Sequence, residues 1–535
     1  MKKFLLILTF LVTYVSFSQQ DAWVYFNDKP NSAAFFSNPL SELSQRALDR
    51  RTAQNIALVL NDAPLEATYV SQITAATGIT VKARSKWLNC LHIRGSFTDI
   101  QALLAFPFVN HVHFADNSLN AKIVVLPTIV PVNKQLDVQV NFNYGTSANQ
   151  IQMLNGHLLH QANYTGTGKI IAVLDAGFPN VNTIAPFQRL RDNNQILGGF
   201  DYVNQSTNFY SGFDHGTMVL STMGGYVDGQ LVGTAPDAKY YLYITEDVAS
   251  ENPVEESNWV EAAEQADRVG VDIITTSLGY FAFDNPNYGH TYSDMTGNSA
   301  FASQGANIAY TKGIIVLASA GNEGNNFEPH VGVPAEATNV LAVGAVKADK
   351  TYASFSSIGP SFDGRIKPDV MAQGQSSILS NTSGNIVAAS GTSFSCPIMA
   401  GMIACLWQAV PNLTNQQLLN VYKQSCDRFS NPDNQYGYGI PDFQLALNTA
   451  LSINQNETNS FVIFPNPTSN SVSISFPNNY TNATVCFYNT LGQILIEKTI
   501  STSVSNVSLE ALNSGVYFYK IDSNSFTQSG KIIKE

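Results

Sequence analysis

Charged side chains are scarce in this sequence: they make up 13% of its 535 residues, whereas 44% of the residues are hydrophobic. Basic residues are the scarcer kind, with 28 Lys and Arg against 40 Asp and Glu, which leaves a net charge of −12. Binding to phosphate groups needs a basic surface, so the composition argues against nucleic acid or an anionic membrane as a partner. The length and composition predict a globular protein of roughly two to four domains.

Cysteines are also few, and their number, five, is odd. Cys396 and Cys405 fall within one predicted helix, on opposite faces and about 13 Å apart, which is too far for a disulfide. A pair between Cys405 and Cys426 stays open. The sequence favours free cysteines that pack as small apolar side chains.

Long apolar runs are absent from the sequence except near its start. The run at 4–15 is shorter than the roughly 20 residues that a helix needs to cross a bilayer. Two lysines precede it, and Ser16, Phe17 and Ser18 follow as a small-residue cleavage motif. We therefore expect residues 1–18 to be a secretory signal peptide and the mature form to have no transmembrane segment.

The first region after this leader, residues 19–117, alternates strand-like and helix-like patterns, with predicted strands at 55–60 and at 109–114 among them. The alternation predicts a small α+β domain of the β-α-β-β-α-β type. Residues 118–147 are polar, contain two prolines and show no periodicity. They are typical of a linker.

The largest region, residues 148–453, contains short and continuous apolar runs with helical patterns between them. These runs lie at 169–174, 239–244, 271–275, 313–317 and 339–343. Because strands buried on both faces look like this, the region predicts an α/β fold with a doubly wound, mainly parallel sheet. Residues 454–535 change to short strands separated by Asn, Gly and Ser turns, which predicts a small all-β sandwich.

Three short segments carry residue types that work together in nucleophilic catalysis. Asp175 ends a predicted buried strand, His215 lies in Asp-His-Gly-Thr, and Ser393 begins an apolar helix in Gly-Thr-Ser-Phe-Ser-Cys-Pro. Taken singly, each has an ordinary structural reading as a turn residue, a helix-start histidine or a helix cap. Together they supply a nucleophile, a base and a carboxylate that orients the base. An α/β-hydrolase esterase is excluded, since it needs Gly-x-Ser-x-Gly and a different residue order.

Two further segments follow predicted strands. Asn322 lies in Ala-Gly-Asn-Glu-Gly, where a side-chain amide can donate to a developing oxyanion or simply form a turn. Ser277, Leu278 and Gly279 leave an edge that an extended peptide can join through main-chain hydrogen bonds.

These segments, in this order, resemble those of the subtilisin-like serine proteases (subtilases) over about residues 151–451. The resemblance implies that Asp175 orients the base, His215 acts as general base and acid, and Ser393 attacks. It implies that Asn322 stabilises the oxyanion. The residues it places beside the P1 side chain of the substrate are Ser277, Leu278, Gly279, Ala318, Ser319, Ala320 and Gly321.

The flanking regions resemble parts that accompany such proteases. Residues 19–117 resemble the inhibitory propeptide, with a separate binding domain as the other reading, and the maturation cut is then expected in the linker 118–147. Residues 454–535 resemble the C-terminal sorting domain of type IX secretion cargo. The alternative interpretation is a carbohydrate- or protein-binding β-sandwich. The resemblance implies the secretion machinery as a partner and a secreted or outer-surface location.

The function that these observations predict is a secreted serine endopeptidase, made as a zymogen, which cuts extended polypeptides through an acyl-enzyme. The alternative is a surface-displayed binding protein on a catalytically silent subtilase scaffold. The main departures from the family pattern are Ala176, Phe394 and a long segment at 280–312, which is either a lid or a surface insertion.

No cofactor is required for this chemistry, but subtilases often carry structural calcium. One acidic cluster offers candidate ligands, although solvated loop charge is the favoured explanation for it. Its members are Glu246, Asp247, Glu251, Glu255 and Glu256.

Overall fold

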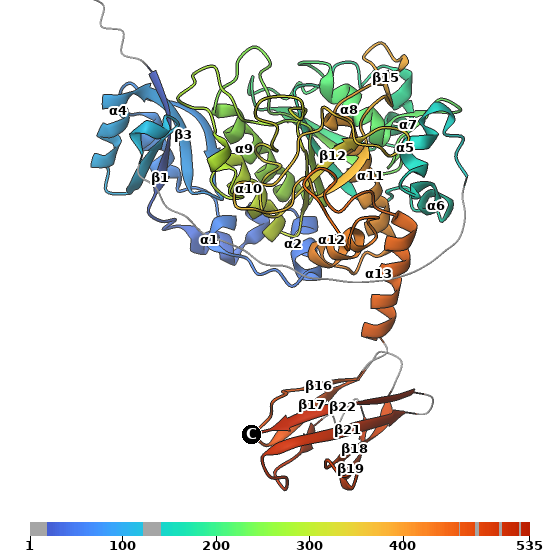
Figure 1. Cartoon of the computed structure of the whole chain (residues 1–535). Coiled ribbons are helices and arrows are strands. Elements are labelled where there is room, and N and C mark those ends of the chain that lie inside the picture. The colour runs from blue at the N-terminus through green and yellow to red at the C-terminus, as the bar shows by residue number, and fades with distance from the viewer. Residues whose placement is uncertain (1–18, 121–140, 459–460, 477–480, 502–505, 524–525) are drawn as a thin grey trace, which may run out of the picture. The chain divides into compact units, whose positions relative to one another are not determined.

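Seven strands form the central sheet of the computed structural model, in the order β13-β12-β11-β10-β5-β9-β6 (Figure 1). They are β5 (Ile170–Asp175), β6 (Ile196–Asp201), β9 (Lys239–Ile244), β10 (Ile273–Thr276), β11 (Ile315–Ser319), β12 (Val340–Val346) and β13 (Val370–Gln373). Every neighbouring pair is parallel, so the carboxyl ends of all seven strands lie at one edge of the sheet. The predicted doubly wound, parallel fold is confirmed.

Helices cover both faces of this sheet. The long ones are α8 (His215–Gly224), α9 (Val254–Val269), α10 (Phe301–Thr311) and α11 (Thr392–Ala409). Ile170 and Ala172 of β5 share a hydrophobic cluster with Trp259 of α9. The alternate residues Ile171 and Val173 are also fully buried, on the face where α8 and α11 pack. Burial on both faces explains why these strands are continuous apolar runs.

The structure describes residues 19–120, 141–458, 461–476, 481–501, 506–523 and 526–535. The predicted signal peptide, and most of the predicted linker, lie outside these ranges. Within them, no helix combines the length and apolar character needed to span a membrane. The described chain divides into two units, one ending at Leu447 and the other comprising Asn448–Glu535.

Further helices and two hairpins complete the first unit around the central sheet. The helices are α5 (Ala148–Gln152), α6 (Gly156–Gln161), α7 (Gln188–Asp192), α12 (Asn415–Gln424) and α13 (Phe443–Thr458), which continues past Leu447. Two hairpins pair β7 (Tyr226–Val227) with β8 (Leu231–Val232), and β14 (Ser377–Ser380) with β15 (Ile386–Ala389).

The N-terminal region is an antiparallel sheet in the order β2-β3-β1-β4. Its strands and helices are β1 (Gln19–Phe26), α1 (Ser32–Ser37), α2 (Gln45–Ala53), α3 (Ala67–Thr74), β2 (Thr80–Ser85), β3 (Cys90–Ser96), α4 (Phe97–Ala102) and β4 (Val109–Phe114). The predicted α+β sandwich is present, with β1, α3, β2, β3, α4 and β4 in the expected sequence.

The predicted strand at 55–60 is wrong, because β1 takes its place as the first strand. Asn55 has a positive φ of 55°, and the Ile56 N–H bonds back to the Arg51 carbonyl at the end of α2. The chain therefore turns at this point, and no described strand pairs with it. A short run of apolar residues predicted a strand where the chain instead forms an irregular segment.

This N-terminal sheet packs against α9 and α10. The Trp23 ring stacks on Phe301 of α10 with centroids 5.0 Å apart, and its Nε1 donates to Ser257 Oγ of α9 at 2.9 Å. Glu264 of α9 accepts a hydrogen bond from the Trp87 N–H at 2.9 Å. The contact is therefore both apolar and hydrogen-bonded.

The long segment 280–312 also contacts this N-terminal region. The Tyr288 hydroxyl accepts a hydrogen bond from the Asp21 N–H at 3.2 Å, and Asn287 Nδ2 donates to Asp116 Oδ2 at 3.1 Å. The sequence predicts either a lid or a surface insertion for this segment. Part of it extends the interface between the N-terminal region and α9.

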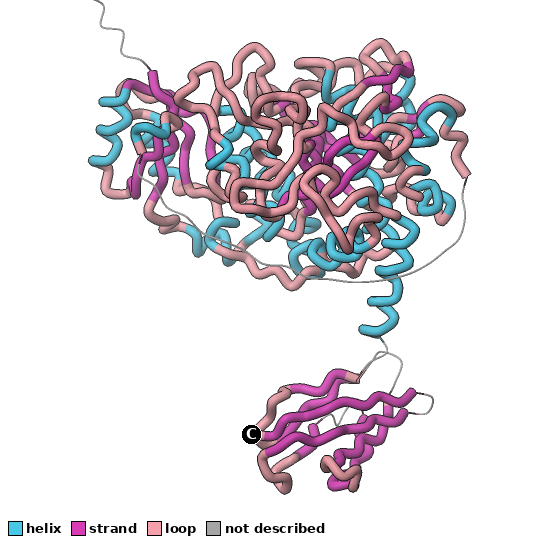
Figure 2. Tube along the Cα trace, in the orientation of Figure 1, coloured by secondary structure: helices cyan, strands magenta, loops and turns pink. Residues whose placement is uncertain are grey.

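The second unit consists of two antiparallel sheets, in the orders β16-β17-β20 and β19-β18-β21-β22 (Figure 2). Their strands are β16 (Val462–Phe464), β17 (Ser471–Ser475), β18 (Asn482–Tyr488), β19 (Ile494–Ser501), β20 (Asn506–Ser508), β21 (Gly515–Ser523) and β22 (Phe526–Lys534). Val472 of one sheet and Val485 and Ile521 of the other share a hydrophobic cluster. The predicted all-β module is confirmed.

Candidate active site

Asp175 is the last residue of β5, and its side chain is fully buried at the carboxyl edge of the sheet. Its Oδ1 accepts hydrogen bonds from the Ala176 N–H and from His215 Nδ1, each at 2.8 Å. The second bond places the ring proton on Nδ1 when the imidazole is neutral. Nε2 then carries the free lone pair and is the atom that can take up a proton.

His215 begins α8, and the residue after it sets how closely this helix approaches β5. A Cβ atom on Gly216 would lie 2.4 Å from the Gly177 carbonyl oxygen and 2.9 Å from the Asp175 Cβ. Only glycine permits this approach, because any side chain would push α8 away from the strand. The Asp-His-Gly motif therefore supplies both the imidazole and the glycine that lets α8 approach β5 closely.

The pKa of His215 is raised above its usual value. Burial of the ring lowers the pKa, but the Asp175 carboxylate, through its charge and hydrogen bond, and the charge of Asp214 outweigh this effect. The side chain keeps 23% of its surface exposed, so protons can exchange with solvent. The neutral form, which can act as a base, thus prevails only above this raised pKa.

Ser393 is the second residue of α11 and is 8% exposed. Its hydroxyl donates to the Ser277 carbonyl at 3.4 Å, and the Ser277 hydroxyl donates to the Ser393 carbonyl at 2.9 Å. Pro397 has no N–H, so it cannot make the helical bond that would normally occupy that carbonyl. Proline at this position frees the Ser393 carbonyl for Ser277, which fixes the first turn of α11 to the end of β10.

The turn that carries Ser393 lies beside the imidazole. The Phe394 and His215 ring centroids are 6.1 Å apart. Among the residues that the structure describes, the Ser393 hydroxyl donates to the Ser277 carbonyl and not to the His215 ring. Such bonds are commonly long or misaligned before substrate binds, and a rotation about the Ser393 side chain would redirect the hydroxyl.

Asn322 follows β11 and is oriented by Thr392, the residue before Ser393. The Asn322 Oδ1 accepts from the Thr392 N–H at 2.9 Å and from the Thr392 hydroxyl at 3.1 Å. The Thr392 hydroxyl in turn accepts from the Gly321 N–H at 3.2 Å. The sequence prediction missed this role of Thr392, although the residue adjoins the candidate nucleophile.

These bonds engage the amide oxygen of Asn322 and leave its Nδ2 as a donor. The Ser393 N–H lies in the first turn of α11, where a backbone donor has no helical partner. Neither donor has a hydrogen-bond partner among the residues that the structure describes. The two N–H groups are suited to bind an oxyanion that forms next to the Ser393 hydroxyl.

The residues predicted to flank a substrate side chain lie on two adjacent strand ends, because β10 pairs with β11 with Thr276 opposite Ala318. Exposure rises along the first segment from buried Ser277 to exposed Gly279. The remaining members extend these two segments, and they are Leu278, Ser319, Ala320 and Gly321.

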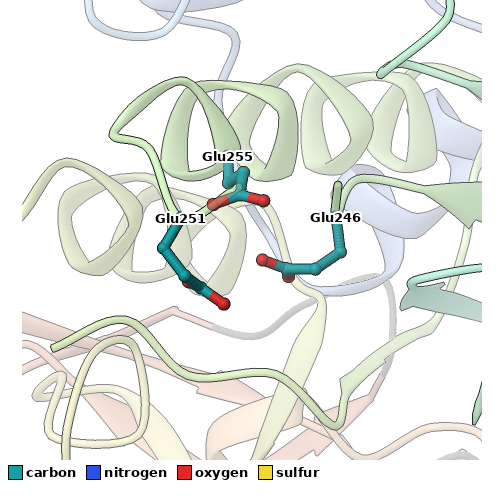
Figure 3. A group of neighbouring side chains, drawn as sticks. All are labelled: Glu246, Glu251 and Glu255. Atoms are coloured by element: carbon teal, nitrogen blue, oxygen red, sulfur yellow. The ribbon is translucent and has the colours of Figure 1, made fainter. Parts of the chain in front are cut away.

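Three members of the predicted acidic cluster come together after β9. One carboxylate oxygen each of Glu246, Glu251 and Glu255 lies within 4.8 Å of the others, and Figure 3 shows the side chains converging. Burial raises the pKa of Glu246 well above its usual value, and the charges of Glu255 and Glu251 raise it further. Burial also raises the pKa of Glu255 to about 7. The three carboxyl groups of this cluster therefore carry a combined negative charge that is smaller than three.

The cluster does not by itself fit the cage of a calcium ion, which takes six to eight oxygen ligands. Both oxygens of Glu255 already accept backbone hydrogen bonds at 2.9 Å, from Asp247 and Asn252. Glu256 points elsewhere and bonds to His290 Nε2 at 2.7 Å. Structural calcium stays a prediction from the family resemblance.

Comparison with known families assigns each region. Residues 166–439 match the Subtilase family, residues 21–128 match the Peptidase S8 propeptide domain of Bacteroidota, and residues 462–535 match the Secretion system C-terminal sorting domain. The first match covers just over half of the chain.

Curated relatives are similar over the same region. Subtilisin NAT from Bacillus subtilis subsp. natto is 31% identical over 303 residues, which cover 55% of this chain and 70% of that protein. Serine protease AprX from Bacillus subtilis (strain 168) is 30% identical over 305 residues, 51% of this chain and 65% of AprX. Alkaline elastase YaB from Bacillus sp. (strain YaB) is 28% identical over 322 residues, covering 60% and 74%.

Replacing Asp175 by Asn should lower the pKa of His215, because the carboxylate is the leading group that raises it. The measurement is an NMR titration of the His215 ring, assigned by its loss in a His215→Ala protein. Asp214→Asn is the matched control and should lower the pKa less. An unchanged His215 pKa in Asp175→Asn would contradict the proposed coupling.

Proposed function

The chain belongs to the subtilase family and is a serine-type endopeptidase, and from that premise we propose that Asp175, His215 and Ser393 are its catalytic triad. The proposal includes Asn322 as the side-chain donor to the oxyanion. One observation carries it: the 2.8 Å bond between Asp175 and His215 lies at the sheet edge where Ser277 holds the Ser393 turn.

The geometry supports acyl-enzyme chemistry. His215 Nε2 takes the proton of the Ser393 hydroxyl while the oxygen attacks the substrate carbonyl, and Asp175 stabilises the imidazolium that forms. The carbonyl oxygen becomes an oxyanion that accepts hydrogen bonds from the Ser393 N–H and Asn322 Nδ2. His215 then gives its proton to the leaving amine, and a water molecule repeats the sequence to release the acid and restore Ser393.

The substrate proposed for this site is an extended polypeptide. Its main chain would pair with Ser277, Leu278 and Gly279, since exposed Gly279 presents backbone groups without a side chain. The P1 side chain would lie between this segment and the one from Ala318 to Gly321. No metal or organic cofactor takes part in the proposed steps.

The matched propeptide and sorting domains support the proposal that the enzyme is made as an exported zymogen. The sorting domain marks the protein for type IX secretion to the cell surface or the exterior. We propose that the propeptide occupies 19–117 after a signal peptide at 1–18, that the peptidase domain spans 148–453 and that sorting uses 454–535. The maturation cut would then fall within 118–147.

Replacing Ser393 by Ala should reduce casein hydrolysis at least about 1,000-fold and abolish covalent labelling by a fluorophosphonate. Ser395→Ala is the matched control, because the Ser395 hydroxyl is buried and donates to the Thr392 carbonyl within α11 at 3.0 Å. That variant should still be labelled. A fully processed wild-type protein that takes up no label would favour the silent-scaffold alternative.

The pH profile of kcat/KM should show loss of activity in acid. Because the His215 pKa is raised above 6.5, the neutral base is present above that pKa and is lost as pH falls through it. The half-point should therefore lie above pH 6.5, with about a tenfold decrease per pH unit below it. Recovery of activity in samples returned to neutral pH controls for unfolding in acid. A flat profile of kcat/KM from about pH 4 to about pH 9 would exclude His215 as the base.

Loss of a whole oxyanion donor lowers kcat about 10²–10³-fold. Thr392→Val removes only a hydroxyl that positions such a donor, so it should lower kcat about tenfold and leave KM nearly unchanged. Valine matches threonine in shape but lacks the hydroxyl that holds Asn322 and Gly321. Thr392→Ser should restore kcat. In an Asn322→Ala background the Thr392→Val change should have little further effect, and an undiminished effect there would contradict positioning through Asn322.

A further inference from the structure

The propeptide carries an insertion that its α+β sandwich does not need. Residues 27–66, here called the docking segment, lie between β1 and α3 and contain α1 and α2. They have a small hydrophobic cluster of their own, which includes Phe35, Leu43 and Ala63. Figure 1 shows α2 beside the ends of α9 and α10, away from the β1–β4 sheet.

Arginines of α2 make buried ion pairs with the peptidase domain. Arg51 binds the Asp267 carboxylate of α9 with both ends of its guanidinium, at 2.8 and 2.9 Å, and Arg50 binds the same carboxylate. The three side chains are 2%, 5% and 0% exposed in the order Arg51, Arg50 and Asp267. Burial raises the pKa of Asp267, but the two arginines outweigh it and the pKa is lowered. The carboxylate is thus charged in this contact, and its two arginine partners both come from the docking segment.

The same helix satisfies main-chain groups at the ends of α9 and α10. Arg46 Nε donates to the Gly270 carbonyl at 2.8 Å, just past α9, and Arg50 Nε donates to the Lys312 carbonyl at 3.0 Å, just past α10. The Ser44 N–H donates to the Arg268 carbonyl at 2.8 Å. Carbonyls at helix ends carry partial negative charge, so the arginines complement both the dipoles and the acidic side chains.

Further polar pairs extend this contact to the start of β11 and to α12. Gln54 Nε2 donates to the Gly313 carbonyl at 2.9 Å, and its Oε1 accepts from the Asn415 N–H at 2.8 Å. Lys312 Nζ reaches Asp62 of the docking segment at 3.1 Å. Without the segment, this surface would present carboxylates and helix-end carbonyls to solvent, which are the acceptors that an arginine-bearing partner fits.

This contact lies at the edge of the central sheet opposite the active site. Arg46 pairs with Asp272, whose carboxylate also accepts the Ile170 N–H at the start of β5. Asp175 ends the same strand five residues later, about 16 Å away at the rise of a β-strand. A cut in the linker therefore breaks none of these bonds and leaves the Trp23 contact with α10 intact as well.

We propose that residues 27–66 dock the propeptide at the amino-terminal edge of the central sheet and keep it bound after the linker is cut. The cut is part of the proposed zymogen function, on which this inference rests. The peptidase domain then has two propeptide surfaces. One, on α9 and α10, is apolar and hydrogen-bonded, and the other, at the sheet edge, is ionic. Release of the propeptide needs the loss of both.

The test uses the full chain made inactive by Ser393→Ala, with the recognition sequence of an unrelated site-specific protease placed within 121–140. After cleavage, size-exclusion chromatography over time measures how fast the propeptide leaves the peptidase domain. The docked form should elute as one complex. Arg50→Ala with Arg51→Ala should speed release about 100-fold or more, since both remove partners of a buried carboxylate. Asp49→Ala with Thr52→Ala, exposed on the same helix, should change nothing.

A milder variant covers the case in which the double arginine change prevents folding. Arg46 is 40% exposed in its side chain, so Arg46→Ala should fold and still speed release about tenfold. Immediate separation of the cleaved parent protein, or release from the folded arginine variants at the parental rate, would overturn the proposal. Because the added protease makes the cut, the rate of release can be measured whether or not Ser393 is the nucleophile, and the two proposals can fail separately.

Discussion

The first turn of α11 must lie against the carboxyl edge of the parallel sheet, because the other candidate groups are positioned relative to it. Two contacts hold it there: the paired hydroxyl–carbonyl bonds of Ser277 and Ser393, and the bonds of Thr392 to Asn322. Pro397 makes the first contact possible by leaving a helix carbonyl without its usual donor. A turn fixed in this way keeps Ser393, the candidate nucleophile, on the side of the sheet where His215 lies, without a direct bond between them.

Much of this arrangement could be predicted from the sequence. The strand at 239–244 was predicted with the bounds it has, because a short run rich in aromatic and apolar residues is typical of a strand. β6 was not predicted, since it is a half-buried edge strand with Gly198 and Gly199 in its middle. The residue types of Asp175 and His215 indicated their chemistry, and their hydrogen bond follows from strand and helix ends that meet.

Other features could not be read from the sequence, because they depend on which distant groups meet. The segment at 55–60 has the apolar pattern of a strand, yet the chain turns at Asn55 and β1 is the first strand of the sheet. Nothing in the pattern around Thr392 shows that its hydroxyl would orient Asn322. Nothing in the sequence around Arg51 indicates its partner, and only the fold shows Arg51 paired with Asp267, 216 positions further along the chain.

Activation of the proposed zymogen then needs two separate events, which are cleavage of the linker and separation of the two propeptide interfaces. Trp23 shares a hydrophobic cluster with Trp259, so the propeptide covers apolar surface that the peptidase domain otherwise exposes. The docking segment adds ionic contacts at the opposite sheet edge from the active site. Such an arrangement would keep a cleaved zymogen assembled during export, when the sorting domain still has to be recognised.

The central claim is that α11 presents Ser393 to an oxyanion site made with Asn322 and to the imidazole of His215. A crystal structure of the processed enzyme after reaction with a fluorophosphonate tests this most directly. The account predicts phosphorus bonded to Ser393 Oγ, with the phosphoryl oxygen in hydrogen-bond reach of Asn322 Nδ2 and the Ser393 N–H. An adduct on another side chain, or a phosphoryl oxygen turned away from Asn322, would contradict it.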